Sequence, residues 1–487
     1  MDGQSASQPV AGSRVLRNAT LLVVAQAIAA PVAVLVNAIA GRELGATGFG
    51  RYYQLLTFAS FTLLFVEWGQ PGALTARVAT EHAAAGELLG SGLAFRLCTA
   101  VLACLTVPLL CALVGYDRGF VTLLAAALLG GAFTTVAGAC QDVLRGFERT
   151  DFAAASYVGW QLLSAAVVVP TLLLGGGLRG MVFAQVACTA AGAAFVLGML
   201  PRLQVPRLSV RWATVTKLVR GGQPFLVFGL VLLLQPMVDA AMLSAFAAPE
   251  AMGWYAAARK LIGVLTYPAS ALLAALYPTL CRLRLESMDA FRSTAADSLY
   301  AVAITVVPLA LGCALFPDLG VAIFGQRYYG PATDDLRLLA PYVLLVYFSM
   351  PIGSCLTASG RQVSWTVVQF ACVVVSTVID PPAIHWFQEH GGNGGLGVCL
   401  TTLASEILMV IGGLWLLPKG ILGKMPRARL LAVALSGMLM AAVALSLGSV
   451  DVVVRAILAV LAYLIGLRLL GGANFPQLRS LLGVLRR

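Results

Sequence analysis

Charged side chains are scarce in this sequence. Asp, Glu, Lys and Arg together make up 11% of its 487 residues, against about 25% in a typical soluble domain. Hydrophobic residues make up 60%, and the mean hydropathy is +0.89. Histidine occurs only three times. So little charge excludes an ordinary soluble globular protein and indicates a chain whose surface faces lipid.

The sequence also lacks the motifs that mark several classes of enzyme. It contains no Walker lysine loop, no dinucleotide-binding fingerprint and no His-Glu-x-x-His. The ten cysteines include no Cys-x-x-Cys pair, and most lie in or beside apolar stretches, which favours small apolar fillers over a metal site. No connection is long enough for a soluble catalytic domain. We therefore expect no enzyme activity, no catalytic residues, no cofactor and no metal site.

Long apolar stretches are the dominant feature that is present. Each has about 18–25 residues, enough to cross a hydrocarbon core of about 30 Å. Their approximate limits are 19–40, 51–74, 92–114, 120–140, 154–175, 180–200, 223–247, 254–278, 298–316, 336–357, 363–382, 396–417, 430–448 and 452–471. The first exceeds the apolar core of a signal peptide, about 7–15 residues, so we interpret it as a retained helix. The predicted fold class is an all-α polytopic membrane protein with about fourteen transmembrane helices.

Basic residues predict how these helices are oriented. With the N-terminus inside, 21 basic residues fall in inner segments and six in outer ones, namely Arg42, Arg51, Arg118, Arg179, Arg327 and Arg337. This asymmetry fits the positive-inside rule and predicts both termini in the cytoplasm. It also accounts for the net charge of +11 without a nucleic-acid partner. The longest outer connection carries Asp318, Asp334 and Asp335, which we expect to be solvated rather than to bind a metal ion.

Two segments 203 residues apart read alike. Phe49-Gly50-Arg51-Tyr52 and Met252-Gly253-Trp254-Tyr255 each open an apolar stretch. Six spans lie between them, so both copies cross the membrane in the same direction, which predicts two parallel six-helix repeats with a substrate path between them. The predicted organisation is a cytoplasmic tail (1–18), a first half (19–200), a cytoplasmic linker (201–222), a second half (223–417), and two extra helices with a basic cytoplasmic tail (418–487).

Ionisable residues inside spans are candidates for function, because each costs about 2.5–3.5 kcal/mol on insertion scales. Asp239 lies in the outer third of the seventh span, and Gln235 lies one turn earlier on the same face. Arg259 and Lys260 lie at the same depth on the eighth span. These residues form either a structural ion pair or part of the transport path, and both interpretations can hold together.

Other polar residues within spans are further candidates for substrate binding or coupling. Glu67 lies in the inner half of the second span. Gln26 and Asn37 face the same side of the first helix, where amides either join helices or contact substrate. Glu406 lies near the middle of the twelfth span, and it is protonated, paired or a proton-coupling site.

Arginines at the inner ends of spans have two possible roles. Arg145 and Arg361 are our candidates for basic residues that face the cavity. Long basic side chains at such positions commonly extend to lipid headgroups. We therefore keep both interpretations, headgroup contact and cavity lining, for each of the two arginines.

Two runs of residues resemble a known family. The first is Ala40-Gly41-Arg42-Glu43-Leu44-Gly45 followed by Gly48-Phe49-Gly50-Arg51-Tyr52, and the second is Asp239-Ala240-Ala241-Met242-Leu243 followed by Gly253 to Leu261. They are similar to the junctions between the first and second helices and between the seventh and eighth helices of Wzx-type bacterial polysaccharide flippases. That family belongs to the multidrug/oligosaccharidyl-lipid/polysaccharide exporter superfamily, which also holds drug/cation antiporters and peptidoglycan-lipid flippases.

The resemblance implies a substrate and partners. The substrate would be an undecaprenyl-pyrophosphate-linked oligosaccharide, moved from the inner to the outer leaflet of the bacterial plasma membrane for surface polysaccharide (exopolysaccharide) assembly. The implied partners are membrane lipids and the polysaccharide polymerase and export machinery. Arg259 and Lys260 suit the phosphate oxygens of such a headgroup. An ion-coupled drug or metabolite antiporter is the alternative. A membrane glycosyltransferase or polymerase would need carboxylates clustered on a sizeable outer loop.

Overall fold

The computed structural model describes residues 9–147, 149–200, 206–425 and 427–472, and these form helices and their connections, without strands. The elements in chain order are α1 (Pro9–Glu67), α2 (Gln70–Thr80), η1 (His82–Ala84), α3 (Ala85–Val114), α4 (Arg118–Gly146), α5 (Thr150–Leu173), α6 (Gly177–Met199), α7 (Trp212–Phe246), α8 (Pro249–Leu265), α9 (Tyr267–Glu286), α10 (Met288–Leu315), α11 (Pro317–Ala322), α12 (Gln326–Ala358), α13 (Gln362–Gly391), α14 (Gly395–Leu416), η3 (Leu422–Lys424), α15 (Arg427–Ser446) and α16 (Val452–Leu469). The predicted all-α class is confirmed.

Twelve helical segments of the described chain are long and apolar enough to cross a membrane. One of them, in α1, contains two predicted spans that meet at Gly45, and the predicted span 254–278 is divided between α8 and α9. With these two differences taken into account, the structure agrees with about fourteen membrane helices. The outer faces are correspondingly apolar; on α3, for example, Leu105, Leu109 and Leu113 are exposed on one face.

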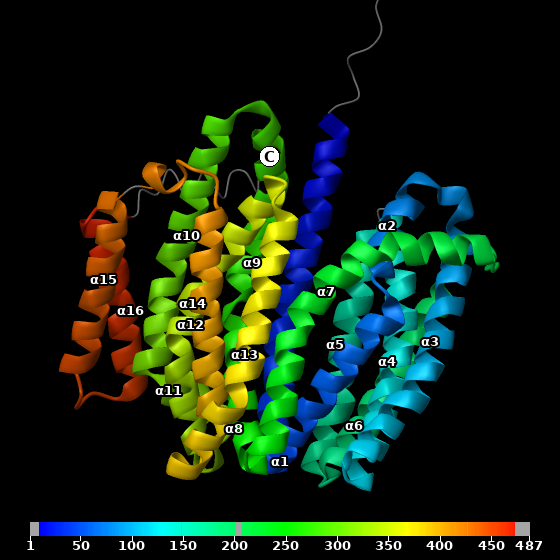
Figure 1. Cartoon of the computed structure of the whole chain (residues 1–487), viewed down its shortest axis with the longest axis horizontal. Helices are drawn as coiled ribbons and strands as arrows, with labels where there is room; N and C mark the ends of the chain where they lie inside the picture. Colours follow the sequence, from blue (N-terminus) through cyan, green and yellow to red (C-terminus); the bar gives the residue numbers. More distant parts are fainter. Residues whose placement is uncertain (1–8, 148, 201–205, 426, 473–487) are drawn as a thin grey trace, which may run out of the picture. The chain divides into compact units, whose positions relative to one another are not determined.

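The chain divides into two compact units, Met1–Ala241 and Met242–Arg487. In the first unit, α3, α4, α5 and α6 run side by side (Figure 1), and a core between α2, α3, α4, α6 and α7 includes Leu74, Leu89, Val143 and Leu218. In the second unit, one core joins α9, α10, α12 and α13, and another joins α10 to the hairpin α15–α16. Each unit therefore buries its own apolar surface.

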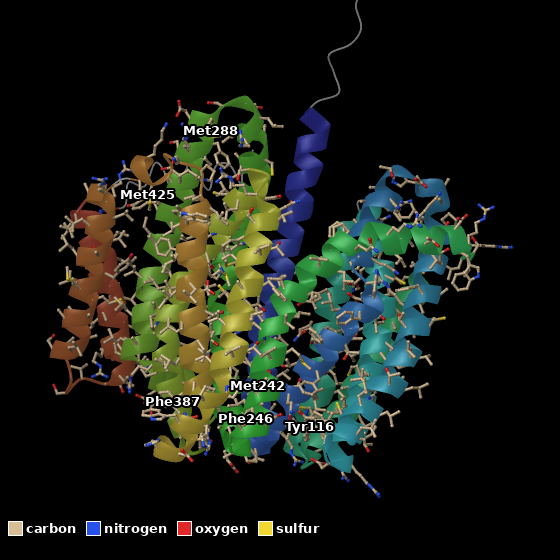
Figure 2. All side chains as sticks on the ribbon, in the orientation of Figure 1. Tyr116, Met242, Phe246, Met288, Phe387 and Met425 are labelled. Carbon is tan, nitrogen blue, oxygen red and sulfur yellow. The ribbon has the colours of Figure 1, made fainter. Side chains whose placement is uncertain are left out.

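An ion pair joins two connections at one end of the second unit. Met242, Phe246 and Phe387 lie at one end, and Met288 and Met425 lie at the other (Figure 2). At the latter end the Lys424 Nζ is 3.2 Å from the Asp289 Oδ1. This ion pair joins the start of α10 to the segment before α15, two connections that the sequence predicts on the same side of the membrane.

The second predicted span of the first half is interrupted. After α1 ends at Glu67, Trp68 (φ 51°) and Gly69 (φ 65°) adopt left-handed conformations before α2 begins at Gln70. Pro71 suits the first turn of α2 because it has no N–H that needs a partner. Helix α7 lies directly against this break, where a Cβ on Gly222 would be 2.2 Å from the Trp68 carbonyl oxygen. Glycine therefore permits backbone-to-backbone contact here.

The second span of the second half is interrupted as well. Helix α8 ends at Leu265 and α9 begins at Tyr267, with Pro268 in its first turn. Proline donates no hydrogen bond, so it interrupts the bonding between the two helices. The Tyr347 hydroxyl of α12 donates to the Leu265 carbonyl at 2.5 Å and satisfies an oxygen at the break. Interrupted helices in corresponding positions of two halves are a recurrent feature of secondary transporters.

A connecting segment also packs closely on the first unit. Residues 206–211, just before α7, run along the start of α3, where a Cβ on Gly90 would be 2.4 Å from the Ser209 carbonyl oxygen. The Ser91 hydroxyl accepts a bond from the Arg211 backbone N–H at 3.0 Å. The Thr214 hydroxyl donates to Glu87 at 2.5 Å. The start of α7 then crosses this end of the first unit (Figure 1), with Leu218 in the core.

Candidate functional site

The first unit contains a cavity of about 840 Å³. It is lined by α4, α5 and α6, together with Glu67 at the end of α1. Pockets that enclose small ligands usually measure roughly 300–1,000 Å³. The cavity therefore has the size of a ligand site, and it lies among helices that the sequence predicts within the membrane.

The lining combines small, aromatic and polar residues. Its polar and aromatic members are Glu67, Thr134, Gln141, Arg145, Phe152, Ser156, Tyr157, Trp160, Thr189 and Phe195. The Gln141 Nε2 of α4 donates to the Ser156 Oγ of α5 at 3.1 Å and so fixes two polar groups at the wall. Gly138 and Gly159 also line the cavity, and a Cβ on either would meet no atom within 4 Å. Small residues thus create the space, and polar side chains border it.

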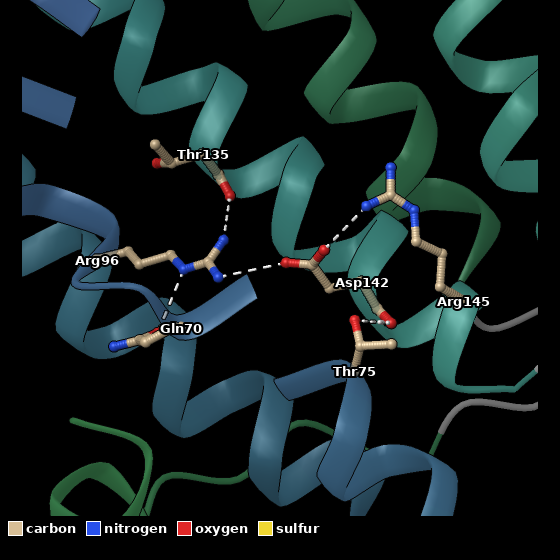
Figure 3. Close-up of polar contacts among 6 residues, drawn as sticks. All are labelled: Gln70, Thr75, Arg96, Thr135, Asp142 and Arg145. Atoms are coloured by element: carbon tan, nitrogen blue, oxygen red, sulfur yellow. Dashed lines mark hydrogen bonds and ion pairs between the residues drawn. The ribbon is translucent and has the colours of Figure 1, made fainter. Parts of the chain in front are cut away.

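A buried arginine lies behind this wall. Arg96 of α3 is fully buried, and its guanidinium donates to the Gln70 Oε1 at 3.2 Å, the Thr135 carbonyl at 3.0 Å and the Asp142 Oδ2 at 3.4 Å (Figure 3). Burying an unpaired charge would be strongly unfavourable. The three acceptors, from α2 and α4, compensate for the lost hydration of Arg96.

Asp142 connects this buried group to the cavity. Its other carboxylate oxygen is 3.4 Å from the Arg145 Nη1, and the side chain of Arg145 is 43% exposed and lines the cavity (Figure 3). The Thr75 hydroxyl of α2 donates to the Asp142 backbone carbonyl at 3.2 Å. One carboxylate is therefore shared by two guanidinium groups, and it holds Arg145 at the cavity wall.

The break between α1 and α2 positions two polar residues of this site. Glu67, the last residue of α1, faces the cavity, whereas Gln70, the first residue of α2, accepts from Arg96. Glu67 also lies within electrostatic range of Arg96 and Asp142. A continuous helix would have placed these two residues about one turn apart on similar faces. The left-handed residues Trp68 and Gly69 turn them to different neighbours.

Two predicted residues, Glu67 and Arg145, thus come together at this cavity. The amide nitrogen of Asn37, on α1, donates to the Ala33 carbonyl of its own helix at 2.7 Å. The side chain of Gln26 lies outside the described residues. Whether the amides of the first helix contact substrate stays a prediction.

The predicted group at the start of the second half divides between the units. Asp239 is fully buried near the end of α7 in the first unit, and Gln235 lies one turn before it. Arg259 and Lys260 lie on α8 in the second unit, where the Arg259 guanidinium stacks 5.3 Å from the centre of the Tyr342 ring. The pairing of Asp239 with these cations therefore stays a prediction.

Two further candidates lie in the second unit. Glu406 of α14 is buried, and its carboxylate is within electrostatic range of the Arg259 guanidinium. Arg361, just before α13, donates to the Leu416 carbonyl at the end of α14. The structure thus brings Glu406 and Arg259 together, and it gives Arg361 a helix-capping contact.

Several buried polar residues were not singled out from the sequence. Arg96 lies inside the predicted span 92–114, so its position alone is a sufficient signal. Asp142 and Asp380 lie at or just beyond the ends of predicted spans, where carboxylates are common. Asp380 of α13 is fully buried and accepts from the Thr401 hydroxyl of α14.

The expectation that Asp335 is solvated is wrong. Asp318 and Asp334 are exposed, but Asp335 is fully buried on α12 and accepts from the Asn393 Nδ2 at 3.0 Å. Helix α12 begins ten residues earlier than the predicted span, at Gln326, and its regular turn directs Asp335 inward and Asp334 outward. Within the described ranges, no three His, Cys, Asp or Glu side chains are grouped to hold a metal ion.

Comparisons with known proteins connect this architecture to transporters. The sequence model of a family described as polysaccharide biosynthesis protein matches residues 15–284. No curated protein matches the sequence significantly. Among solved structures, the inward closed lipid II flippase MurJ matches with a TM-score of 0.72 at 11% identity, covering 92% of this chain and 98% of MurJ.

Two other solved structures show the same fold. An inward-facing multidrug resistance MATE family transporter of the MOP superfamily matches with a TM-score of 0.65 at 15% identity, covering 83% of this chain and 98% of that one. A MOP superfamily transporter from Pyrococcus furiosus matches with a TM-score of 0.57 at 16% identity, covering 82% and 95%. At these identities the likeness establishes a shared fold, and all three neighbours are transporters or flippases.

Proposed function

The chain belongs to the family of polysaccharide biosynthesis proteins, and we propose that it is a flippase for lipid-linked oligosaccharide. Its substrate is an undecaprenyl-pyrophosphate-linked repeat unit, which it moves from the inner to the outer leaflet of the bacterial plasma membrane for surface polysaccharide assembly. The family match over residues 15–284 is the observation that carries this proposal. The MurJ-like fold and the cavity in the first unit support it.

The proposed mechanism is alternating access. The two units would move relative to each other and expose the headgroup to one side of the membrane and then the other, while the lipid tail stays in the bilayer. The sequence contains no Walker lysine loop, so we attribute the driving force to an ion gradient or to downhill movement. Arg259 and Lys260 would bind pyrophosphate oxygens, because cationic groups form charge-assisted hydrogen bonds with them.

The decisive experiment measures the leaflet distribution of labelled lipid-linked oligosaccharide in vesicles. In vesicles with the purified protein, labelled substrate supplied to one leaflet should appear on the other leaflet as well. In protein-free vesicles it should stay on the leaflet to which it was supplied. An Arg259→Gln/Lys260→Gln double variant should lose most of this activity, and the exposed Arg282→Gln should retain it. Equal distributions with and without the protein, also under an imposed proton or sodium gradient, would contradict the flippase proposal.

The fold shared with MATE transporters favours one alternative, an ion-coupled antiporter for drugs or metabolites. Efflux of small organic cations by the same vesicles, without movement of the lipid-linked sugar, would put this function first. In cells, the flippase proposal expects that loss of the protein leaves repeat units on the cytoplasmic leaflet. It also expects both termini in the cytoplasm, and it expects polymerase and export partners to act on the product at the outer leaflet.

A further inference from the structure

We propose that the cavity of the first unit is a subsite for uncharged sugar residues of the transported headgroup, and that the pyrophosphate binds elsewhere. This inference rests on the proposed function, because it assigns one part of the substrate to one place in the protein. The observations that carry it are the charge balance of the cavity, the chemistry of its wall and the way its space is formed.

The charge balance disfavours an anionic ligand. Among the residues that line the cavity in the described part of the chain, the ionisable carboxylate and guanidinium groups are those of Glu67 and Arg145. The Arg145 guanidinium is already directed to Asp142, whose second oxygen faces the buried Arg96. The positive charges of Arg96 and Arg145 are thus balanced by the negative charges of Glu67 and Asp142. A pyrophosphate needs surplus cationic donors to replace its hydration, and this wall supplies none.

The wall suits carbohydrate chemistry instead. A sugar ring presents hydroxyl groups around its edge and apolar C–H groups on its faces. Tyr157 and Trp160 lie one turn apart on α5 and both line the cavity, so they offer aromatic surfaces with polar tips. Gln141 and Ser156, joined at 3.1 Å, add amide and hydroxyl groups beside them. These groups both donate and accept hydrogen bonds, as sugar hydroxyls require.

The packing behind the aromatic surface fixes its position. A Cβ on Gly192 of α6 would lie 3.2 Å from the Trp160 Cδ1, so the indole edge lies close against the α6 backbone. Glycine at this position lets the ring approach α6. A preorganised aromatic platform binds a ring with less loss of side-chain freedom than a mobile one.

The structure offers variants that fill the cavity without disturbing its walls. Because a Cβ on Gly138 or Gly159 meets no atom within 4 Å, leucine at either position would extend into the empty space. Gly198 on α6 is also open by this criterion but does not line the cavity. Gly138→Leu and Gly159→Leu are therefore test variants, and Gly198→Leu is their matched control.

The test measures binding to the purified full-length protein by fluorescence titration. The probes are the free repeat-unit oligosaccharide, prepared by depolymerising the producing organism's own surface polysaccharide, and inorganic pyrophosphate. The wild type and Gly198→Leu should bind the oligosaccharide saturably, and each cavity-filling variant should weaken this binding at least about tenfold, or about 1.4 kcal/mol.

The tryptophan variants test which side chain reports the binding. Trp160→Phe should remove most of the fluorescence change, whereas the exposed Trp415→Phe should not. Pyrophosphate should not displace the sugar.

Three results would overturn the inference: no saturable sugar binding by the wild type at millimolar concentrations, unchanged sugar binding in both cavity-filling variants, or pyrophosphate binding that these variants abolish. The vesicle assay keeps the proposed function separate. Substrate flipping by a wild type that does not bind the free sugar would refute the subsite alone. Sugar binding in the cavity without flipping would refute the function and leave the subsite in place.

Discussion

At the scale of single residues, Arg96 and Asp142 illustrate a buried ion pair that depends on both partners. Removing the carboxylate would leave the fully buried Arg96 with two neutral acceptors. Breaking a buried pair in this way typically costs about 3–5 kcal/mol. We therefore expect Asp142→Leu to lower the thermal unfolding midpoint of the detergent-solubilised protein strongly. The exposed Asp334→Leu should change it little.

A second substitution checks that this loss arises from the uncompensated charge. Replacing both members with apolar residues of similar volume often restores stability. Arg96→Met combined with Asp142→Leu should therefore recover most of the lost midpoint, since Arg145 remains partly exposed to solvent. If the double variant is no more stable than Asp142→Leu, packing rather than charge dominates at this site.

Asp239 provides the second prediction at this scale. It is fully buried on α7, and an ionisable group at such a position is a functional candidate by default. We expect Asp239→Ala to reduce transport about tenfold or more, equivalent to about 1.4 kcal/mol, beyond any loss of protein in the membrane. The exposed Asp318→Ala serves as the control. Full activity and normal expression of Asp239→Ala would show that the residue is neither a required partner nor a coupling site.

At the scale of elements, the contact between α7 and the break after α1 depends on one glycine. A Cβ on Gly222 would lie 2.2 Å from the Trp68 carbonyl oxygen, whereas a Cβ on the neighbouring Gly221 would make an ordinary contact of 3.5 Å with Ala73. Gly222→Ala should thus separate the two backbones at a cost of about 1–3 kcal/mol. Gly221→Ala should be neutral or slightly stabilising, because alanine favours a helix. Comparing the two thermal midpoints tests this, and equal midpoints would argue against a rigid contact.

At the scale of the whole molecule, orientation in the membrane is the main open prediction. Leu208 lies beside the start of α3, at the end of the first unit where α5 begins, and Leu174 follows the last residue of α5. Both side chains are exposed, and they lie at opposite ends of this unit. The excess of basic residues around Leu208 predicts that end in the cytoplasm. In intact cells, an impermeant thiol reagent should label Leu174→Cys but not Leu208→Cys, relative to the parent with its native cysteines. The reverse pattern would invert the topology.

Within the first unit, the sequence led to part of the candidate site. Glu67 and Arg145 were identified because charged residues stand out in or beside apolar spans. The same signal marks Arg96, which lies inside the predicted span 92–114. No such signal marks Asp142, which lies just beyond the predicted span 120–140. Its structural role is the ion pair with Arg96, 46 residues away in the sequence. The aromatic and glycine residues that shape the cavity resemble ordinary membrane-helix composition, so only their arrangement around a common space identifies them.

The sequence by itself determined the all-α membrane fold and the approximate positions of its helices, because a bilayer of fixed thickness requires apolar segments of matching length. The tertiary structure alone decided where helices break and which polar groups meet. The break at Trp68 and Gly69 depends on the approach of Gly222, and the burial of Asp335 depends on Asn393. The helix break and the buried aspartate each depend on a residue far away in the sequence. The local pattern of apolar residues cannot predict such long-range contacts.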